Sequence, residues 1–347
     1  MKHKIALIGG ARPNFMKIAP LYRELESKQE DFIIINTGQH FDDNMASDFL
    51  KEFVIKIDYH IKPNRNSVAA QLADIMIQLE NIFIKEKISL VIVVGDVNST
   101  LAASIVANKL NITLAHVEAG LRSRNYKMPE ENNRIITDQL ADYLLAPSAD
   151  AVENLKSEKL KGQIELVGNI MIDNLVYFLP QIEDSSDEFY FCTLHRAENV
   201  DNKQIFIEIL NALEIIAKDV KIYLPFHPRT KKMAEAFGLL GRIENIFNVL
   251  PPLSYKQSLY YQKNAKLVLT DSGGIQEETT VLGTPCLTIR TETERPITVE
   301  LGTNKVGGVT EKSILEAYKI IDYNKKLSNI PFWDGQTASR IINSIKI

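Results

Sequence analysis

The sequence has few cysteines, little net charge and no long apolar run, and each of these shortages excludes a class of protein. Its two cysteines, Cys192 and Cys286, lie inside apolar stretches, so we expect buried thiols and no disulfide framework. The formal net charge is −4, and the scattered Lys and Arg provide no broad basic surface for a nucleic-acid backbone. No stretch approaches the roughly 18 apolar residues of a membrane span, and residues 5–8 are too short for the apolar part of a signal peptide. We therefore expect a cytoplasmic protein that binds neither nucleic acid nor a membrane.

The chain has the composition of a folded protein with more than one core. Its 347 residues exceed one ordinary domain, and 45% hydrophobic with 24% charged residues is typical of globular proteins. Short runs rich in Val and Ile alternate with stretches of helical periodicity, which predicts an α/β fold with parallel sheets. The strands are expected at residues 5–8, 32–36, 90–94, 113–117, 143–146, 165–167, 189–194, 222–225, 246–249, 267–270 and 286–289.

A domain boundary is predicted near the middle of the chain. Residues 179–188, LPQIEDSSDE, combine a proline, two serines and several acids, which is typical of a surface linker. We therefore expect two doubly wound, Rossmann-like domains, 1–178 and 187–332, facing across a cleft. The apolar periodicity of 338–347 predicts a terminal helix. We expect this helix to dock back on the first domain.

The strongest single motif is TDSGGIQEE at residues 270–278, where a strand meets a helix expected from 275 to 282. The backbone of Gly273 and Gly274 allows a ligand to approach closely, and free amides at a helix start bind anions. The Ser272 hydroxyl adds a hydrogen-bond donor, and Glu278 is placed to accept hydrogen bonds from ribose hydroxyls. These residues predict a diphosphate site, although a glycine turn capped by Ser272 or Asp271 is an alternative.

Cations follow other predicted strands. Arg290 and Arg295 come after the strand at 286–289 and suit phosphate because a guanidinium binds oxygen pairs. Arg12 and Lys17 flank a turn after the first strand, yet this turn lacks the spacing of a dinucleotide or P-loop motif. Surface ion pairs are the alternative for the first pair of cations, and an ordinary strand-to-helix turn is the alternative for the second.

Histidines and acids complete the set of residues after strand ends. His195 and His227 are each close to an arginine in the second domain, which favours function because histidine titrates near neutral pH. Asp96, Glu118 and Glu130 hold similar positions in the first domain, Glu130 beside Glu131 in a loop before a helix at 132–140. Several acids around one cleft can share acid and base duties, although helix capping is an alternative. No histidine spacing matches a metal site, so we expect no required metal.

Several motifs in fixed order carry a resemblance to a known family: GARPNFMK, QH at Gln39 and His40, GDVNSTLAAS, HVEAGLRS, MPEENNR, LHRAEN, HPRT, TDSGGIQEE and TERP. Over nearly the whole chain they resemble the UDP-N-acetylglucosamine 2-epimerase family, bacterial enzymes of the two-domain GT-B fold. The resemblance implies interconversion of UDP-GlcNAc and UDP-ManNAc without a cofactor, by anti elimination of UDP to 2-acetamidoglucal and its re-addition. It also implies a homodimer and a role in surface polysaccharide synthesis.

The matching motifs also imply roles for single residues. The implied catalytic residues are Asp96, Glu118, Glu130 and His195, with Asp96 or Glu118 as the base at C2. The implied substrate-binding residues are Arg12, Lys17, Arg122, His227, Ser272, Gly273, Gly274, Glu278, Arg290 and Arg295. Gln39 and His40 match part of a second UDP-GlcNAc site that activates the non-hydrolysing members.

Some residues depart from the family pattern, and these leave alternatives open. Asn14 stands where Glu is common, and Ile297 follows TERP where Glu is common. The substrate is therefore open among UDP-2-acetamido sugars, including 6-deoxy and uronic forms, and a hydrolysing epimerase that releases ManNAc is a further alternative. A GT-B glycosyltransferase and a non-catalytic UDP-sugar sensor are rivals of another class. The acids at the strand ends of the first domain favour the epimerase.

Overall fold

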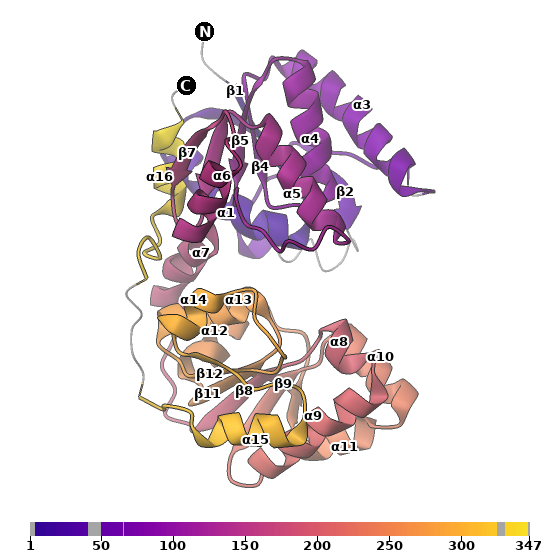
Figure 1. The fold of residues 1–347 in the computed structure, drawn as a ribbon, viewed down its shortest axis with the longest axis vertical. Coiled ribbons are helices and arrows are strands. Elements are labelled where there is room, and N and C mark those ends of the chain that lie inside the picture. Colours follow the sequence, from indigo (N-terminus) through magenta and orange to yellow (C-terminus); the bar gives the residue numbers. More distant parts are fainter. Residues whose placement is uncertain (1–3, 41–49, 65, 325–329, 346–347) are drawn as a thin grey trace. The chain divides into compact units, whose positions relative to one another are not determined.

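The computed structural model describes residues 4–40, 50–64, 66–324 and 330–345. The chain forms two compact units, unit 1 (Met1–Asn174 with Pro331–Ile347) and unit 2 (Leu175–Ile330). Each unit contains its own parallel sheet (Figure 1). The predicted α/β class with two Rossmann-like domains is confirmed.

Unit 1 is built on a seven-stranded sheet in the order β3-β2-β1-β4-β5-β6-β7. Its strands are β1 (Lys4–Ala11), β2 (Asp31–His40), β3 (Tyr59–His60), β4 (Leu90–Val94), β5 (Thr113–Val117), β6 (Tyr143–Ala146) and β7 (Gln163–Leu166). Its helices are α1 (Arg12–Ser27), α3 (Val68–Glu86), α4 (Asn98–Lys109), α5 (Pro129–Leu140), α6 (Ala149–Ser157), the start of α7 (Ile170–Phe178) and α16 (Thr337–Ser344). Since β1 pairs with β2 on one side and β4 on the other, the winding reverses between β1 and β4, where doubly wound sheets bind ligands.

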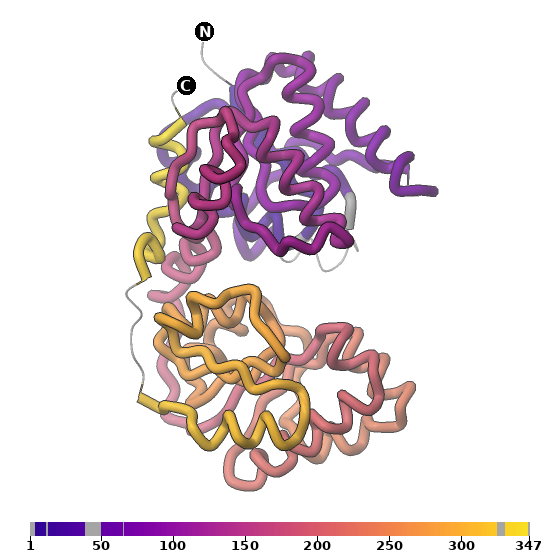
Figure 2. Tube along the Cα trace, in the orientation of Figure 1, coloured from indigo at the N-terminus to yellow at the C-terminus, as the bar shows by residue number. Residues whose placement is uncertain are grey.

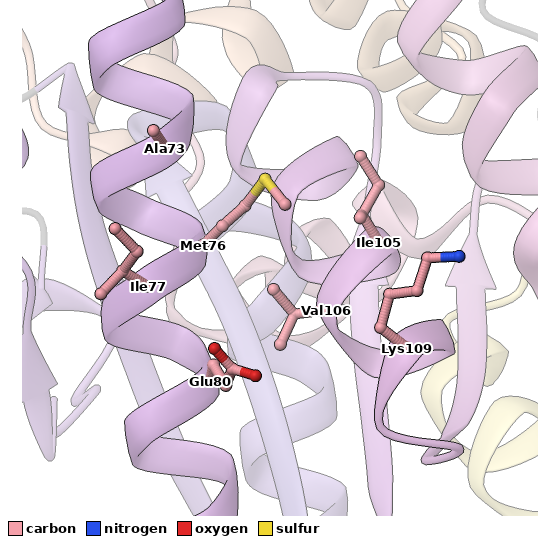
Figure 3. A pocket seen from close by; sticks show the side chains of 7 residues that line it. All are labelled: Ala73, Met76, Ile77, Glu80, Ile105, Val106 and Lys109. Carbon is pink, nitrogen blue, oxygen red and sulfur yellow. The ribbon is translucent and has the colours of Figure 1, made fainter.

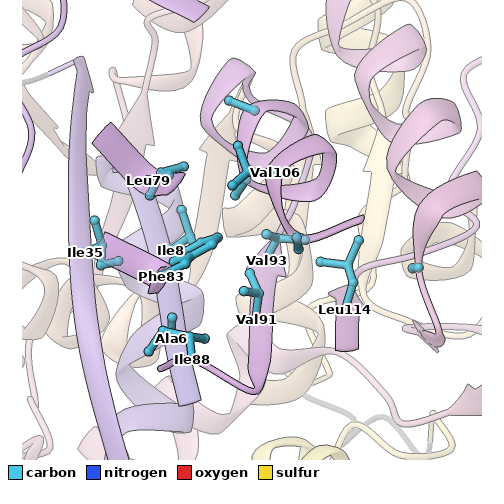
Figure 4. Packing of buried hydrophobic residues seen from close by; sticks show 14 of the residues in the cluster. Ala6, Ile8, Ile35, Leu79, Phe83, Ile88, Val91, Val93, Val106 and Leu114 are labelled. Atoms are coloured by element: carbon cyan, nitrogen blue, oxygen red, sulfur yellow. The ribbon is translucent and has the colours of Figure 1, made fainter. Parts of the chain in front are cut away.

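The core of unit 1 shows why these segments fold as they do. All five residues of β4, LVIVV, are buried, as expected for a parallel strand covered on both faces. Helix α3 begins where the Ser67 side chain accepts the amide of Ala70, and it buries Ile75, Leu79 and Phe83 at four-residue spacing. This stripe packs against the sheet (Figure 4).

The last helix of the chain belongs to unit 1. The Asp173 carboxylate accepts the amides of Thr337 at 3.1 Å and Ala338 at 2.7 Å, which caps the start of α16. Helix α16 also contacts α1, and Figure 2 shows the yellow C-terminal segment beside the trace of unit 1. The apolar pattern predicts this helix at 338–347, and the observed helix is Thr337–Ser344.

Unit 2 repeats the plan with a six-stranded sheet in the order β10-β9-β8-β11-β12-β13. Its strands are β8 (Phe189–Thr193), β9 (Lys221–Pro225), β10 (Asn248–Leu250), β11 (Leu267–Thr270), β12 (Cys286–Thr288) and β13 (Asn304–Val306). Its helices are η1 (Leu179–Gln181), α8 (Ala197–Val200), α9 (Lys203–Ile216), α10 (Pro228–Phe237), α11 (Leu240–Ile246), α12 (Tyr255–Asn264), α13 (Gly273–Leu282), α14 (Pro296–Glu300) and α15 (Glu311–Lys319). Here the winding reverses between β8 and β11.

The structure differs from the sequence-based expectations at several boundaries. Strands β3 and β13, of two and three residues, were not anticipated. Helix α5 begins at Pro129 and not at 132, because proline favours the first turn of a helix, so Glu130 and Glu131 lie inside the helix. The change of unit falls inside α7, before the expected linker at 179–188. Within the described ranges, no helix is both long and apolar enough to cross a membrane.

Candidate active site

Asp96 lies at the edge of unit 1 where β4 ends and is held by an arginine from α5. A carboxylate oxygen of Asp96 contacts the Nη2 atom of Arg134, and the backbone oxygen of Asp96 accepts the Asn133 amide at 2.9 Å. The Asp96 side chain remains 24% exposed, so it is held by protein contacts and still open to solvent. This is the arrangement expected of a carboxylate that acts on a bound molecule.

Glu118 follows the neighbouring strand β5 and is paired with a lysine from α1. Its Oε2 atom contacts Lys17 Nζ, across 101 residues of sequence, and the Glu118 side chain is 12% exposed. The backbone of Glu118 is left-handed, with φ of +69°, which is rare for a residue other than Gly, Asn or Asp. Strained non-glycine residues concentrate at functional sites because their neighbours must hold them in place.

Two adjacent glutamates at the start of α5 have opposite surroundings. Glu130, expected as a catalytic residue, is exposed, whereas Glu131 is buried and accepts the amides of Ser123 and Arg124 at 2.9 Å each. Burial raises the pKa of Glu131, but these amides and Arg134 together hold it below the ordinary value. Glu131 therefore shapes the loop before α5, while Glu130 is available to a ligand.

The guanidinium of Arg122 lies inside unit 1, although the family pattern implied a contact with substrate. Its Nη2 atom is 2.8 Å from Asp138 and 2.7 Å from Glu158, and its side chain is 4% exposed. Asp138 also contacts His116 in the middle of β5. The geometry favours a role for Arg122 in positioning this buried group.

Three expected site residues have side chains outside the described part of the chain. Arg12 begins α1, next to the end of β1, and Gln39 with His40 ends β2. The backbones of Ala11 and His40 are partners in the register of β1 and β2. Asn14, a departure from the family pattern, is buried and accepts the amides of Gly10 and Ala11, which closes the turn after β1.

The matching edge of unit 2 is organised by Asp271, the residue after β11. Its buried carboxylate accepts the amides of His195 and Arg196 at 2.9 Å and lies 2.9 Å from the His195 Nδ1 atom. It therefore binds the loop after β8 and does not cap its own helix, which was the sequence-based alternative. The His195 side chain is 37% exposed, so its Nε2 face is accessible.

Gly273 and Gly274 form the first residues of α13, two residues earlier than the expected helix start. Neither has a positive φ, and apart from the neighbouring residues and backbone of α13 no described atom lies within 4 Å of a Cβ placed on Gly274. At Gly273 the nearest such atom is the Arg196 Nη2 at 4.0 Å. Unit 2 itself therefore leaves room for side chains here, and close approach of a ligand to the helix start explains the glycines better than packing does.

Arginines surround this helix start, and glutamates partly neutralise them. Arg290 is buried and contacts Glu294 at 3.1 Å, and Arg196 contacts the same carboxylate at 3.4 Å. Burial raises the pKa of Glu294, but the charges of Arg196, Arg290 and Arg295 hold it below its ordinary value. Arg295 Nε also lies 2.7 Å from Glu277. These ion pairs hold the arginines in place beside the start of α13, where they can bind an anionic ligand.

Glu278, expected at the ribose, is buried against α12. Its Oε2 atom accepts a hydrogen bond from Gln262 at 2.8 Å, and burial raises its pKa to about 7. His227 caps α10, where its Nδ1 accepts the Arg229 amide at 3.2 Å, so its Nε2 carries the ring proton. The ring centres of His227 and His195 are 5.4 Å apart, which brings both predicted histidines to one edge.

A shallow apolar groove lies away from these polar residues. Met76 and Ile77 of α3 face Ile105 and Val106 of α4, with one acid and one base, Glu80 and Lys109, beside them (Figure 3). The Ile77 side chain is 57% exposed. Its apolar lining and distance from the strand ends favour a protein contact over a site for a charged nucleotide.

The sequence motifs do not assign a role to several residues of the site. Arg134 is the last residue of MPEENNR, yet it contacts both Asp96 and Glu131. His116 and Asp138 are 22 residues apart, and no local spacing indicated that they meet. Of these residues, only Arg134 could have been linked to the acids from the sequence. It comes four residues after Glu130, and residues with this spacing lie on the same face of a helix. Among the residues that the structure describes, no cluster of three or more His, Cys, Asp or Glu forms a metal site.

Comparison with known proteins finds relatives over nearly the whole chain. The family model described as UDP-N-acetylglucosamine 2-epimerase matches residues 23–346. A UDP-N-acetylglucosamine 2-epimerase of Methanocaldococcus jannaschii is 38% identical over 98% of both chains. A UDP-2,3-diacetamido-2,3-dideoxy-D-glucuronate 2-epimerase of Pseudomonas aeruginosa is 38% identical over 97% of this chain and 98% of its own.

The likeness extends to solved structures. The crystal structure of the M. jannaschii UDP-GlcNAc 2-epimerase, in complex with UDP-GlcNAc and UDP, has a TM-score of 0.82, is 37% identical and covers 98% of each chain. The GT-B class implied by the sequence motifs is thereby confirmed. The chain belongs to the UDP-N-acetylglucosamine 2-epimerase family.

Proposed function

We propose that this protein is a non-hydrolysing UDP-sugar 2-epimerase, an isomerase that interconverts UDP-GlcNAc and UDP-ManNAc for surface polysaccharide synthesis. The observation that carries the proposal is the pair of carboxylates, Asp96 and Glu118, at the ends of neighbouring strands. Each is held by a cation and still reaches solvent. Two positioned acids fit a reaction that removes a proton from one face of a sugar and returns a proton to the other.

The chemistry assigns a separate task to each unit. The C2–H bond has no adjacent carbonyl to acidify it, so departure of UDP must first build positive charge at C1. A carboxylate, Asp96 or Glu118, then takes the C2 proton, and the products are UDP and 2-acetamidoglucal. Re-addition of UDP at C1, with a proton delivered to the opposite face of C2, gives the epimer, and no atom is gained or lost. Glu130 is the third acid in this proposal.

Unit 2 holds the leaving group. The start of α13, with Ser272, Gly273 and Gly274, offers amides to the diphosphate, and His195, Arg290 and Arg295 supply charge and hydrogen bonds beside it. Support comes from the open space above both glycines and from the nearby arginines. Glu278 accepts hydrogen bonds from the ribose hydroxyls, and the remaining expected contacts to the nucleotide sugar come from Arg12, Lys17 and His227.

The deciding experiment is incubation with UDP-GlcNAc in D₂O, followed by NMR of the sugar. We expect UDP-ManNAc with deuterium at C2. Free ManNAc with UDP would identify a hydrolysing enzyme instead. If the C2 proton is retained in all recovered sugar, UDP-GlcNAc is not epimerised by this protein.

A second substrate class is favoured by a specific comparison. The P. aeruginosa relative, named for a diacetamido uronic sugar, is as identical to this chain as the M. jannaschii enzyme is. Asn14 and Ile297 also depart from the family pattern near the site. Parallel D₂O incubations with UDP-GlcNAc and with UDP-2,3-diacetamido-2,3-dideoxy-glucuronic acid distinguish the two, because the true substrate exchanges C2 hydrogen faster at equal concentration.

Two further properties belong to the same proposal. UDP-GlcNAc activates the enzyme through a second site that includes Gln39 and His40, and the measurement is the initial rate from UDP-ManNAc with and without added UDP-GlcNAc. The protein is also a homodimer. The groove between α3 and α4 supports this, because it is apolar and carries Glu80 and Lys109, which can pair across a twofold axis.

A further inference from the structure

A buried histidine and aspartate connect the two turns that carry the acids of unit 1. We propose that His116 and Asp138 are positioning residues for Asp96 and Glu118, with His116 held as an imidazolium. The kinetic part of this inference rests on the proposed epimerase function, whereas the protonation state of His116 does not.

His116 lies in β5 and is fully buried, as is the Asp138 side chain. Its Nδ1 atom is 2.6 Å from Asp138 Oδ1, and its Nε2 atom is 2.8 Å from the backbone oxygen of Gly95. The other oxygen of Asp138 accepts the Gly120 amide at 3.1 Å. Gly95 immediately precedes Asp96, and Gly120 lies two residues after Glu118.

The hydrogen-bond partners define the protonation of the ring. A carbonyl oxygen only accepts, so the Nε2 atom facing Gly95 carries a proton. Asp138 accepts from the Gly120 amide and contacts the Arg122 guanidinium at 2.8 Å, which is the surrounding of an ionised carboxylate. The Nδ1 atom facing this carboxylate therefore carries a proton as well. A buried imidazolium is tolerated because a carboxylate pairs with it.

The surroundings of Asp138 favour its ionised form. Burial raises the pKa of Asp138, but the charges and hydrogen bonds of His116 and Arg122 outweigh burial and hold its pKa below the ordinary value. Asp138 thus stays ionised at neutral pH. The charged groups around the ring belong to β5, α5 and the loop that carries Arg122.

Both connected turns have backbone conformations that need support. Gly95, Glu118 and Gly120 all have left-handed φ values, +67°, +69° and +81°. Such a conformation in Glu118 costs free energy that the surrounding structure must supply. A Cβ placed on Gly95 would lie 3.0 Å from Lys17 Nζ and 3.7 Å from Glu118 Oε2, so this turn adjoins the acid itself. Loosening either turn would displace the carboxylates.

The protonation state is tested on the unaltered protein. In a ¹⁵N-histidine sample, we expect long-range ¹H–¹⁵N spectra at neutral pH to show both ring nitrogens of His116 protonated. The signal is assigned by its loss in His116→Gln. A spectrum with one unprotonated ring nitrogen would overturn the inference, whether or not the protein epimerises UDP-GlcNAc.

The positioning role is tested with two substitutions that each keep one donor. His116→Gln retains a donor toward the backbone oxygen of Gly95, and His116→Asn retains a donor toward Asp138. We expect kcat to fall about 10²-fold in each, since misplacing catalytic groups by about 1 Å has an effect of this size. KM and the Kd for UDP should change less than about threefold, because the proposed UDP site lies in unit 2.

Two controls separate positioning from general loss of structure. His60→Gln, at the exposed end of β3, should leave kcat unchanged. The Kd for UDP, measured calorimetrically on each variant, reports whether the nucleotide site is intact. Unchanged kcat in both position-116 variants would overturn the positioning role, and so would losses of UDP affinity as large as those in kcat.

Discussion

The Nδ1 atom of His195 lies 2.9 Å from Oδ1 of Asp271, 76 residues later in the chain. Burial raises the pKa of Asp271, but the hydrogen bond and charge of His195 and the backbone amides hold it below the ordinary value. Asp271 is therefore ionised and accepts from the Nδ1 of His195, whose side chain is 37% exposed. The carboxylate that follows β11 thus sets both the position and the ring orientation of the histidine that follows β8.

Asp271→Asn should lower kcat about 10²-fold, because an amide offers one acceptor oxygen in place of two and the His195 loop shifts. The rate of C2 deuterium incorporation measures the effect, and the thermal midpoint of unfolding measures any loss of folded protein. Asp201→Asn is a matched control, since Asp201 is an exposed carboxylate in the same unit, paired with Arg229. A folded Asp271→Asn protein with wild-type turnover would contradict the role of Asp271.

The adjacent residues Glu130 and Glu131 should respond differently to the same substitution. Glu131→Gln removes an acceptor for the amides of Ser123 and Arg124 and should reduce the free energy of unfolding of unit 1 by about 1–3 kcal/mol. Glu130→Gln changes an exposed side chain and should leave stability within about 0.5 kcal/mol. It should lower kcat about 10²–10⁴-fold if Glu130 is an acid or base.

The loss of stability caused by Glu131→Gln should depend on pH. Because its folded pKa lies below the ordinary value of 4.5, ionised Glu131 stabilises unit 1 above that pH, and this contribution is lost as pH falls through the folded pKa. Urea unfolding followed by the fluorescence of Trp333, the single tryptophan and part of unit 1, measures it. Equal destabilisation at pH 7 and pH 3 would exclude this explanation.

Glu278 should impose the opposite pH dependence on unit 2. Burial raises its pKa from 4.5 to about 7 on folding. The folded state is therefore less stable at pH values where Glu278 is ionised than at pH values where it is protonated. Relative to Glu278→Gln, the wild type should lose about 3 kcal/mol of local stability as pH rises from 4.5 to 7. Hydrogen exchange of β11 peptides, compared between the two proteins at each pH, measures this difference. A difference independent of pH would show that folding does not raise the pKa of Glu278.

The groove between α3 and α4 should control self-association. Ile77→Glu places a charge among Met76, Ile105 and Val106 and should convert a dimer to a monomer in sedimentation velocity. Val68→Glu is the matched control, because this exposed residue of α3 is nine positions away and so faces the opposite side. A monomeric wild type, or a dimeric Ile77→Glu protein, would refute the proposed surface.

The fold class and the positions of the candidate site residues along the chain can be predicted from the sequence alone. Strands β11, β4 and β5 have the bounds that the sequence predicts, 267–270, 90–94 and 113–117, because buried parallel strands leave short, mainly apolar runs. Polar residues after those runs had to lie at the carboxyl edge of a sheet. The strand bounds and the position of the polar residues both follow from the local pattern of apolar and polar residues, which can be seen in a single sequence.

The contacts among these side chains cannot be predicted from local patterns and are seen only in the folded chain. Lys17 and Glu118 come together because β1 and β5 flank β4, and nothing near either residue encodes that order. Glu130 and Glu131 are neighbours in sequence, yet the helix start at Pro129 exposes one and buries the other. Arg122, expected at the substrate, is turned inward by Asp138. Such contacts depend on strand order and helix orientation, which are fixed by packing over long separations in sequence.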